Sequence, residues 1–136
     1  MSKGNTAEND TIKKFFHAIE LSWDGNASLF VALHTADPGE AGSQTTSEAT
    51  YTSYARVTVA RDATGWDVAG DSASNDDLLQ FPQATGGTNT ITHVSIGTAV
   101  SGAGQIIYSG ALASSVSVSN GIQPQFNANA LVTTED

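Results

Sequence analysis

The pattern that most constrains the fold is a series of short segments in which apolar and polar residues alternate. Residues 115–119 and 122–126 are two such segments, and Asn120-Gly121 lies between them. An Asn-Gly pair in this setting is a strong signal for a β-hairpin, because a type I′ turn needs two positive φ angles. Residues 54–61 show the same period of two, which is typical of a half-buried strand.

Further candidate strands occupy residues 29–34, 66–68, 78–81, 90–96, 105–108 and 128–132. Glycine-rich turns separate several of them. About eight short strands at a spacing of ~8–12 residues are typical of an antiparallel sandwich or barrel. We therefore predict a mainly β fold, an antiparallel β-sandwich of jelly-roll-like form, with one short N-terminal α-helix and a long extended loop.

The helix signal lies near the N-terminus. Ile12, Phe15, Phe16 and Ile19 follow the i, i+3, i+4, i+7 spacing and form one apolar stripe. Asp10 is suited to cap the first turn. A helix this short is marginal alone, so the stripe must dock, either on the domain's own sheet, which we expect, or on a neighbouring molecule.

A chain of 136 residues is expected to form one domain around one core. We predict a flexible N-terminal arm at residues 1–9 and a single β-sandwich domain at residues 10–136, including the helix at 10–22. The N-terminus lacks the apolar core of a signal peptide, and no run approaches the ~18 apolar residues of a membrane span. We expect synthesis in a cytosol and a soluble product.

The charge distribution narrows the choice of partners. The net charge is −9, and there is no Lys or Arg from Asp62 to Asp136. Binding to nucleic acid or to anionic membranes rests on Lys and Arg, so neither is expected. Only 14% of residues are charged. A surface of small and hydroxyl residues suits contacts with other proteins, and it equally suits the solvent-facing side of a sandwich.

The histidines offer little catalytic chemistry. His34 and Asp37 could be drawn as a base and its acid partner, but no activated nucleophile accompanies them. The chain has no cysteine, and His-x-x-Asp alone falls short of the three converging ligands of a zinc site. We predict a protein that is not an enzyme, with no cofactor. A histidine that hydrogen-bonds backbone is the favoured interpretation of His34.

An acidic stretch runs from Asp67 to Asp77, and its oxygen ligands are of the kind that Ca²⁺ prefers. The spacing does not match the EF-hand loop, and the same residue types are common in turns. The stretch is expected to be a solvated acidic loop, with a Ca²⁺ site left open as the alternative.

Residues 35–53 separate two strands and contain little that could form a core. Loops of this length in small domains are usually functional or disordered. We interpret the segment as an arm that lies over a neighbouring subunit, with tyrosines as anchors; a loose surface loop is the alternative. The predicted partner interface comprises Asp37, Pro38, Glu40, Gln44, Glu48, Tyr51 and Tyr54, together with Phe15 and Phe16 of the helix.

Five motifs carry a resemblance to a known family. They are LHTADPGEAG, YTSYAR, FPQATGG, HVSIGT and VSNG, in this order, and they span about residues 29–126. The ordered set resembles small virion structural proteins of tailed bacteriophages, including proteins described as tail-fibre-like and as head-decoration proteins. The resemblance implies a non-enzymatic, β-rich protein located in the virion after synthesis in the host cytoplasm.

The place within the particle depends on further reasoning. A fibre shaft normally needs long repetitive sequence, which this chain lacks, whereas many small contacts on a lattice add up through copy number. We therefore expect a capsid decoration (cement) protein that binds the outer head surface and stabilises the shell. Its partners would be the major capsid protein, neighbouring copies of itself, or both, in a homo-oligomer or lattice. The alternative is a tail or tail-fibre-associated protein, including one that binds a receptor or glycan.

Overall fold

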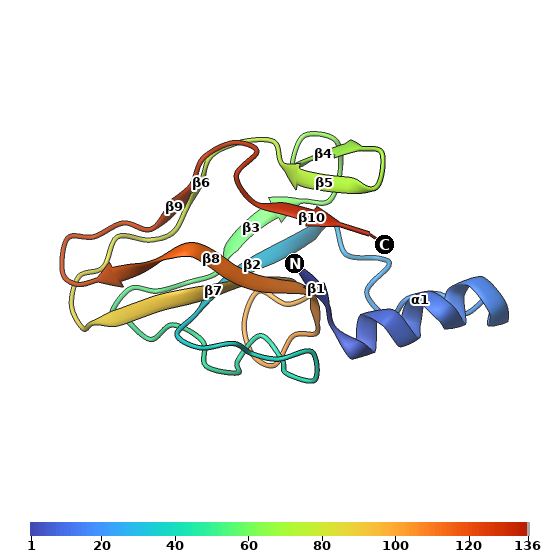
Figure 1. The fold of residues 1–136 in the computed structure, drawn as a ribbon, viewed down its shortest axis with the longest axis horizontal. Helices are drawn as coiled ribbons and strands as arrows, with labels where there is room; N and C mark the ends of the chain where they lie inside the picture. Colours follow the sequence, from blue (N-terminus) through green and yellow to red (C-terminus); the bar gives the residue numbers. More distant parts are fainter. Residues whose placement is uncertain (136) are drawn as a thin grey trace.

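The computed structural model of the protein describes residues 1–135 and shows a β-rich body from which one helix projects (Figure 1). The elements are β1 (Ser2–Lys3), α1 (Asn5–His17), β2 (Ser28–His34), β3 (Val57–Ala60), β4 (Trp66–Ala69), β5 (Ser72–Asn75), β6 (Leu79–Gln80), β7 (Asn89–Gly97), β8 (Ile106–Val118), β9 (Gln125–Phe126) and β10 (Val132–Thr134).

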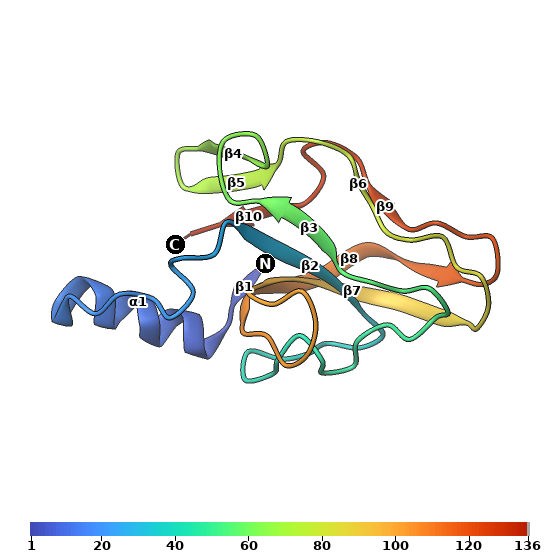
Figure 2. The same ribbon diagram turned by 180° about the vertical axis from the view of Figure 1, so that it is seen from behind.

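The strands form one five-stranded sheet and two smaller sheets. The order of the large sheet is β1-β8-β7-β2-β3, and its neighbouring strands are antiparallel. The sheets β10-β5-β4 and β6-β9 lie along one side of it (Figures 1 and 2). The prediction of an antiparallel β-sandwich with one short helix is therefore confirmed.

The core lies between these layers. On β2, Val31 and Leu33 point into this core and are essentially fully buried, and the intervening Ala32 is buried as well, so both faces of this part of the strand are covered. Phe81, just after β6, is also fully buried, and its ring lies 6.4 Å from that of Tyr54 and 6.2 Å from that of Phe126. These aromatic contacts join the small sheets to the segment that precedes β3.

The hairpin predicted around Asn120-Gly121 is only partly correct. Gly121 has the expected positive φ of 92°, but Asn120 does not, and β9 pairs with β6 rather than with β8. The reason is a long-range contact: the N–H of Gly121 donates to the carbonyl of Ala84, and the N–H of Ala84 donates to the carbonyl of Ile122. These bonds draw the chain after the turn away from β8.

The N-terminus also differs from the prediction of a flexible arm at residues 1–9. Residues 2–3 pair with β8, and the buried Gly4 donates its N–H to the carbonyl of Ile107 at 2.9 Å. The helix begins at Asn5 rather than at residue 10, with Gly4 instead of Asp10 as N-cap, and Ala18 ends it in a left-handed conformation. That residues 10–136 form a single domain stays a prediction.

The apolar stripe of α1 does not pack on the sandwich, contrary to our expectation. Exposed fractions are 58% for Ile12, 75% for Phe15, 80% for Phe16 and 50% for Ile19, and Ala7 is the buried residue of the helix. The cause is the direction of the helix, which starts at the edge strand β1 and extends away from the body (Figure 1).

We predict that Phe81→Ala lowers the free energy of unfolding by about 3–5 kcal/mol, because it leaves a cavity among packed aromatic rings. Phe16→Ala is the matched control and should change it by no more than about 0.5 kcal/mol, since its ring is exposed. Urea unfolding followed by circular dichroism measures both. Equal losses for the two variants would contradict the described core.

Candidate functional site

The connecting segment, residues 35–56, joins β2 to β3 and is part of the folded body. Its backbone pairs with the second half of β2, which β3 does not reach: Ala49 donates to the carbonyl of Leu33, and Thr35 donates to that of Ser47, each at 2.8 Å. In Figure 2 the segment curves beneath the large sheet. The predicted arm over a neighbouring subunit is therefore an internal element of this chain.

A group of buried side chains fastens the connecting segment. The side chain of Arg56 is 2% exposed and forms a two-pronged ion pair with Glu48, with Nε–Oε1 at 2.7 Å and Nη2–Oε2 at 2.8 Å. The remaining guanidinium hydrogens reach the carbonyls of Ala99 at 2.8 Å and Gly102 at 2.7 Å. A guanidinium this deeply buried is tolerable only when it is hydrogen-bonded in this way, while the Glu48 side chain keeps 17% of its surface exposed.

Two further residues complete this group, which we call the polar cluster (Gln44, Glu48, Tyr54 and Arg56). Gln44 is fully buried; its Nε2 donates to the carbonyl of Phe30 at 2.9 Å, and its Oε1 accepts from the N–H of Ala99 at 3.1 Å. The Tyr54 hydroxyl donates to Glu48 at 3.0 Å and accepts from the N–H of Leu33 at 3.1 Å. Burial raises the pKa of Tyr54 well above its usual value.

His34 is held in the same region, and both of its ring nitrogens are in use. Nδ1 lies 2.8 Å from the carbonyl of Thr46, so it must carry the proton and donate. Nε2, 2.8 Å from the Ser95 hydroxyl, then accepts, which describes a neutral imidazole. Burial lowers the pKa of His34. Asp37 does not reach it, because its carboxylate accepts the N–H of Gly39 in a local turn at 2.9 Å.

The structure divides the predicted interface residues into two sets. Gln44 and Tyr51 are buried, and Glu48 and Tyr54 bond inside the polar cluster, so these four face their own chain. Pro38 is buried as well, whereas Asp37, Glu40, Phe15 and Phe16 are exposed. Arg56, which holds the cluster together, was missed. Its position on an alternating strand beside Tyr54 carried no sign of burial.

The acidic stretch Asp67–Asp77 forms the β4–β5 hairpin, with Gly70 at a positive φ of 66° in its turn. Within residues 1–135, no group of three or more His, Asp or Glu side chains is placed to hold a metal ion. Asn75 is buried and bonds the carbonyls of Asp77 and Asn127, so it serves the fold. The stretch is therefore a β-hairpin rather than an irregular loop.

A cavity of about 520 Å³ opens between the large sheet and the β4–β5 hairpin. We call it the tryptophan cavity, because the indoles of Trp23 and Trp66 line it, and within residues 1–135 neither buried indole N–H has a hydrogen-bond partner. Arg61 stacks over Trp23 at 4.7 Å. Val68, two residues after Trp66 on β4, is 70% exposed and lies at the edge of the cavity.

These features define a class: a β-sandwich whose polar interior is used for its own architecture, with an exposed apolar helix as its most evident contact surface. The family described as "Podophage GP4 fiber I protein gp80" matches residues 2–134. The chain therefore belongs to this family, and the resemblance to phage virion structural proteins is confirmed. No curated protein matches the chain.

The family description makes the protein a structural component of a phage virion. Nothing in that description is enzymatic. Along residues 1–135, α1 is too short and too polar to cross a bilayer.

We predict that Glu48→Ala costs about 3–5 kcal/mol of unfolding free energy, because it leaves the buried Arg56 charge without its partner. Glu40→Ala in the same segment is the control, and it should cost less than about 0.5 kcal/mol because Glu40 is exposed. Urea denaturation of the purified variants gives both values. A Glu48 variant as stable as the control would show that the ion pair does not hold the segment.

We also predict a pH dependence that arises from His34. Because burial lowers its pKa, the unfolded chain, with an ordinary value near 6.5, binds more protons than the folded chain at mildly acidic pH. The free energy of unfolding should fall as the pH drops below about 6.5. This window is separate from that of Asp24 and Asp62, whose lowered pKa values act only at more acidic pH.

Unfolding of the wild type and of His34→Gln between pH 5 and pH 8 (roughly the window of an ordinary histidine) tests this assignment. The stability difference between them should shrink as the pH falls, because the variant lacks the titrating group. A pH-independent difference would mean that His34 is not held neutral by the fold.

Proposed function

We propose that the protein is a structural subunit of a phage fibre, and that it acts through protein–protein contacts rather than through catalysis. The observation that carries this proposal is the family match, which covers residues 2–134 and whose description names a fiber protein.

This proposal changes the choice between head and tail that the sequence suggested. Capsid decoration was favoured because a short chain without repeats seemed unable to supply a fibre. A family that matches almost the whole of this chain is nevertheless described as a fiber protein, so the short length of the chain is no longer an argument against a fibre. Fibre association is therefore the better-supported reading, and capsid decoration becomes the second candidate.

The geometry is compatible with such a role. The polar cluster holds the connecting segment on the sandwich, so this segment is a fixed part of the body. The apolar stripe of α1 extends from one end of the body, while the turn at Asn120-Gly121 lies at the other (Figure 1). A compact body with one apolar projection is suited to attachment at its helix end.

Fab fragments raised against the purified protein, imaged on intact particles by electron microscopy, test the proposal. We expect label on the fibres, and we expect particles made without the protein to lose that label together with the fibre density. Label distributed over the head would support capsid decoration and contradict the fibre assignment. Particles without label would contradict any virion role.

A further inference from the structure

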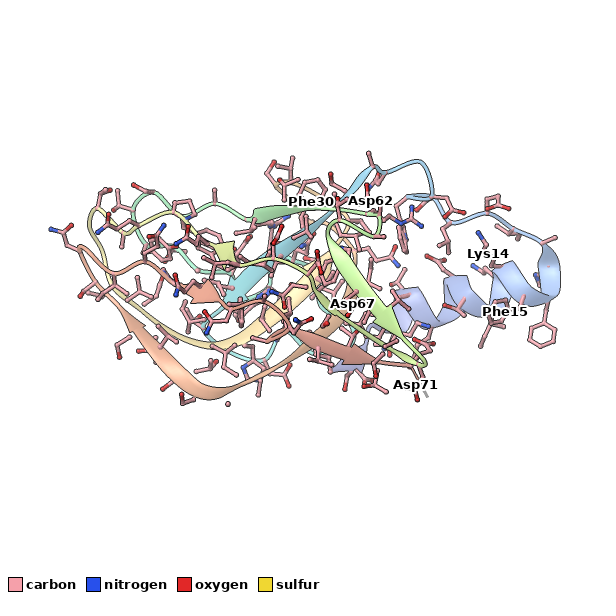
Figure 3. All side chains as sticks on the ribbon, turned by 90° about the horizontal axis from the view of Figure 1, so that it is seen from above. Lys14, Phe15, Phe30, Asp62, Asp67 and Asp71 are labelled. Carbon is pink, nitrogen blue, oxygen red and sulfur yellow. The ribbon has the colours of Figure 1, made fainter. Side chains whose placement is uncertain are left out.

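Two apolar features of the chain have no partner within it, and they lie at the same end of the molecule. One is the stripe of α1, where Phe15 and Phe16 are the most exposed side chains. The other is the tryptophan cavity beneath the β4–β5 hairpin. Figure 3 shows Phe15 pointing away from the sandwich, with Asp62, Asp67 and Asp71 at the end of the body nearest the helix.

The chain's own helix is held away from the cavity. Lys14 bonds Glu20 at 2.9 Å and Asp24 at 2.7 Å, which fastens the loop after α1 back onto the helix. Asp24 in turn bonds Arg61 at 3.0 Å, and Arg61 stacks on Trp23 at the cavity wall. These contacts lie near the surface and hold the loop after α1 beside the helix. Because α1 projects from the body, an occupant of the cavity would come from another molecule.

The walls of the cavity favour an aromatic occupant. Apart from the two indoles, most of the lining is aliphatic, including Leu29, Ile96 and Ile107. The two indoles that line the cavity can pack against an aromatic ring, whereas their N–H groups are buried within the chain. A sugar would bring many hydroxyl groups, and the polar part of the lining is limited to Arg61, Asp62, Asp67, Tyr108 and Thr133. At about 520 Å³, the space exceeds what one side chain needs.

Charge also matches the helix to the cavity. Asp62 and Asp67 line the cavity and are exposed, and the cation beside them, Arg61, is already paired with Asp24. Lys13 lies one turn from Phe16 on the helix and, within residues 1–135, forms no ion pair. A second copy of the chain therefore offers aromatic rings and a free cation together, which is what the cavity and its acids can accept.

We propose that α1 of one copy docks into the tryptophan cavity of a second copy, with Phe15 and Phe16 inserted and Lys13 facing Asp62 and Asp67. Two phenylalanines bury roughly 300–500 Å². Because helix and cavity share one end, a pair of copies can exchange helices reciprocally, which doubles this area. When the area of the cavity walls that these rings cover is added, the total buried area reaches the roughly 1,200–2,000 Å² of a specific interface. The contact itself does not depend on the proposed function; only its role in assembling a fibre rests on that proposal.

Two variants separate the two halves of the contact. The helix variant is Phe15→Asp/Phe16→Asp, and the cavity variant is Val68→Lys, which sets a like charge against Lys13 at an exposed position. Val100→Lys is the matched control, since Val100 is also exposed but lies in the turn after β7. Circular dichroism verifies that all variants keep the fold.

Size-exclusion chromatography with light scattering should give a mass of two copies for the wild type and the control. Each variant alone should give one copy, with self-association at least tenfold weaker. A mixture of the helix variant and the cavity variant should associate more strongly than either variant alone, because one intact helix then meets one intact cavity and one of the two reciprocal contacts is restored. If the helices of two copies paired with each other instead, the result would be the opposite. The two variants would form no dimer with each other, and the cavity variant would still self-associate.

A wild type that remains a single copy at high concentration would overturn the proposal, and so would a dimer that survives Val68→Lys. A glycan-array signal that is lost in Val68→Lys, with the wild type monomeric, would assign the cavity to a sugar and also overturn it. These results do not depend on the particle experiment. Label on fibres together with a monomer in solution leaves the proposed function intact.

Discussion

The ion pair between Arg56 and Glu48 is the interaction on which the rest of the structure depends. It joins Glu48 to Arg56 at the end of the connecting segment, and Arg56 also bonds the turn after β7, which is more than forty residues away in sequence. Because β3 covers only the first half of β2, the second half needs another backbone partner, and the connecting segment supplies it. The ion pair keeps it there, and Gln44 and Tyr54 satisfy the backbone groups that this arrangement buries. A polar segment of about 20 residues thus becomes part of a folded body.

Because the connecting segment packs against its own chain, it does not offer the contact surface that the sequence suggested. The tyrosines that looked like interface anchors pack inside; Tyr51 donates its hydroxyl to the carbonyl of Pro82 and is 2% exposed. The exposed apolar side chains of α1 and the tryptophan cavity form the surface that we propose for a partner. In a virion protein such a division would let the body stay rigid while the projecting helix makes the contacts.

Local patterns predicted many of the elements. Alternation placed β3 and β7, an apolar run placed β2, and the stripe from Ile12 to Ile19 identified the helix. The single strand β8 was predicted as two separate strands, at residues 105–108 and 115–119. Features that depend on distant partners could not be predicted in this way. The stripe says that a helix has an apolar face, but the edge strand from which α1 starts decides whether that face meets the sheet. Likewise, Asn120-Gly121 indicates a turn, while the contacts with Ala84 decide which strand follows it. The burial of Arg56 has the same origin, since both of its carbonyl acceptors lie more than forty residues away.

The central claim is that the connecting segment is a folded element and not an arm, and native-state hydrogen exchange tests it most directly. The account predicts that the amides of Thr35, Gln44 and Ala49, each bonded to a backbone carbonyl, exchange as slowly as those of β2 and β7. The amides of residues 35–56 would exchange at the rate of an open loop if the segment were an arm awaiting a neighbour, and that result would contradict the account.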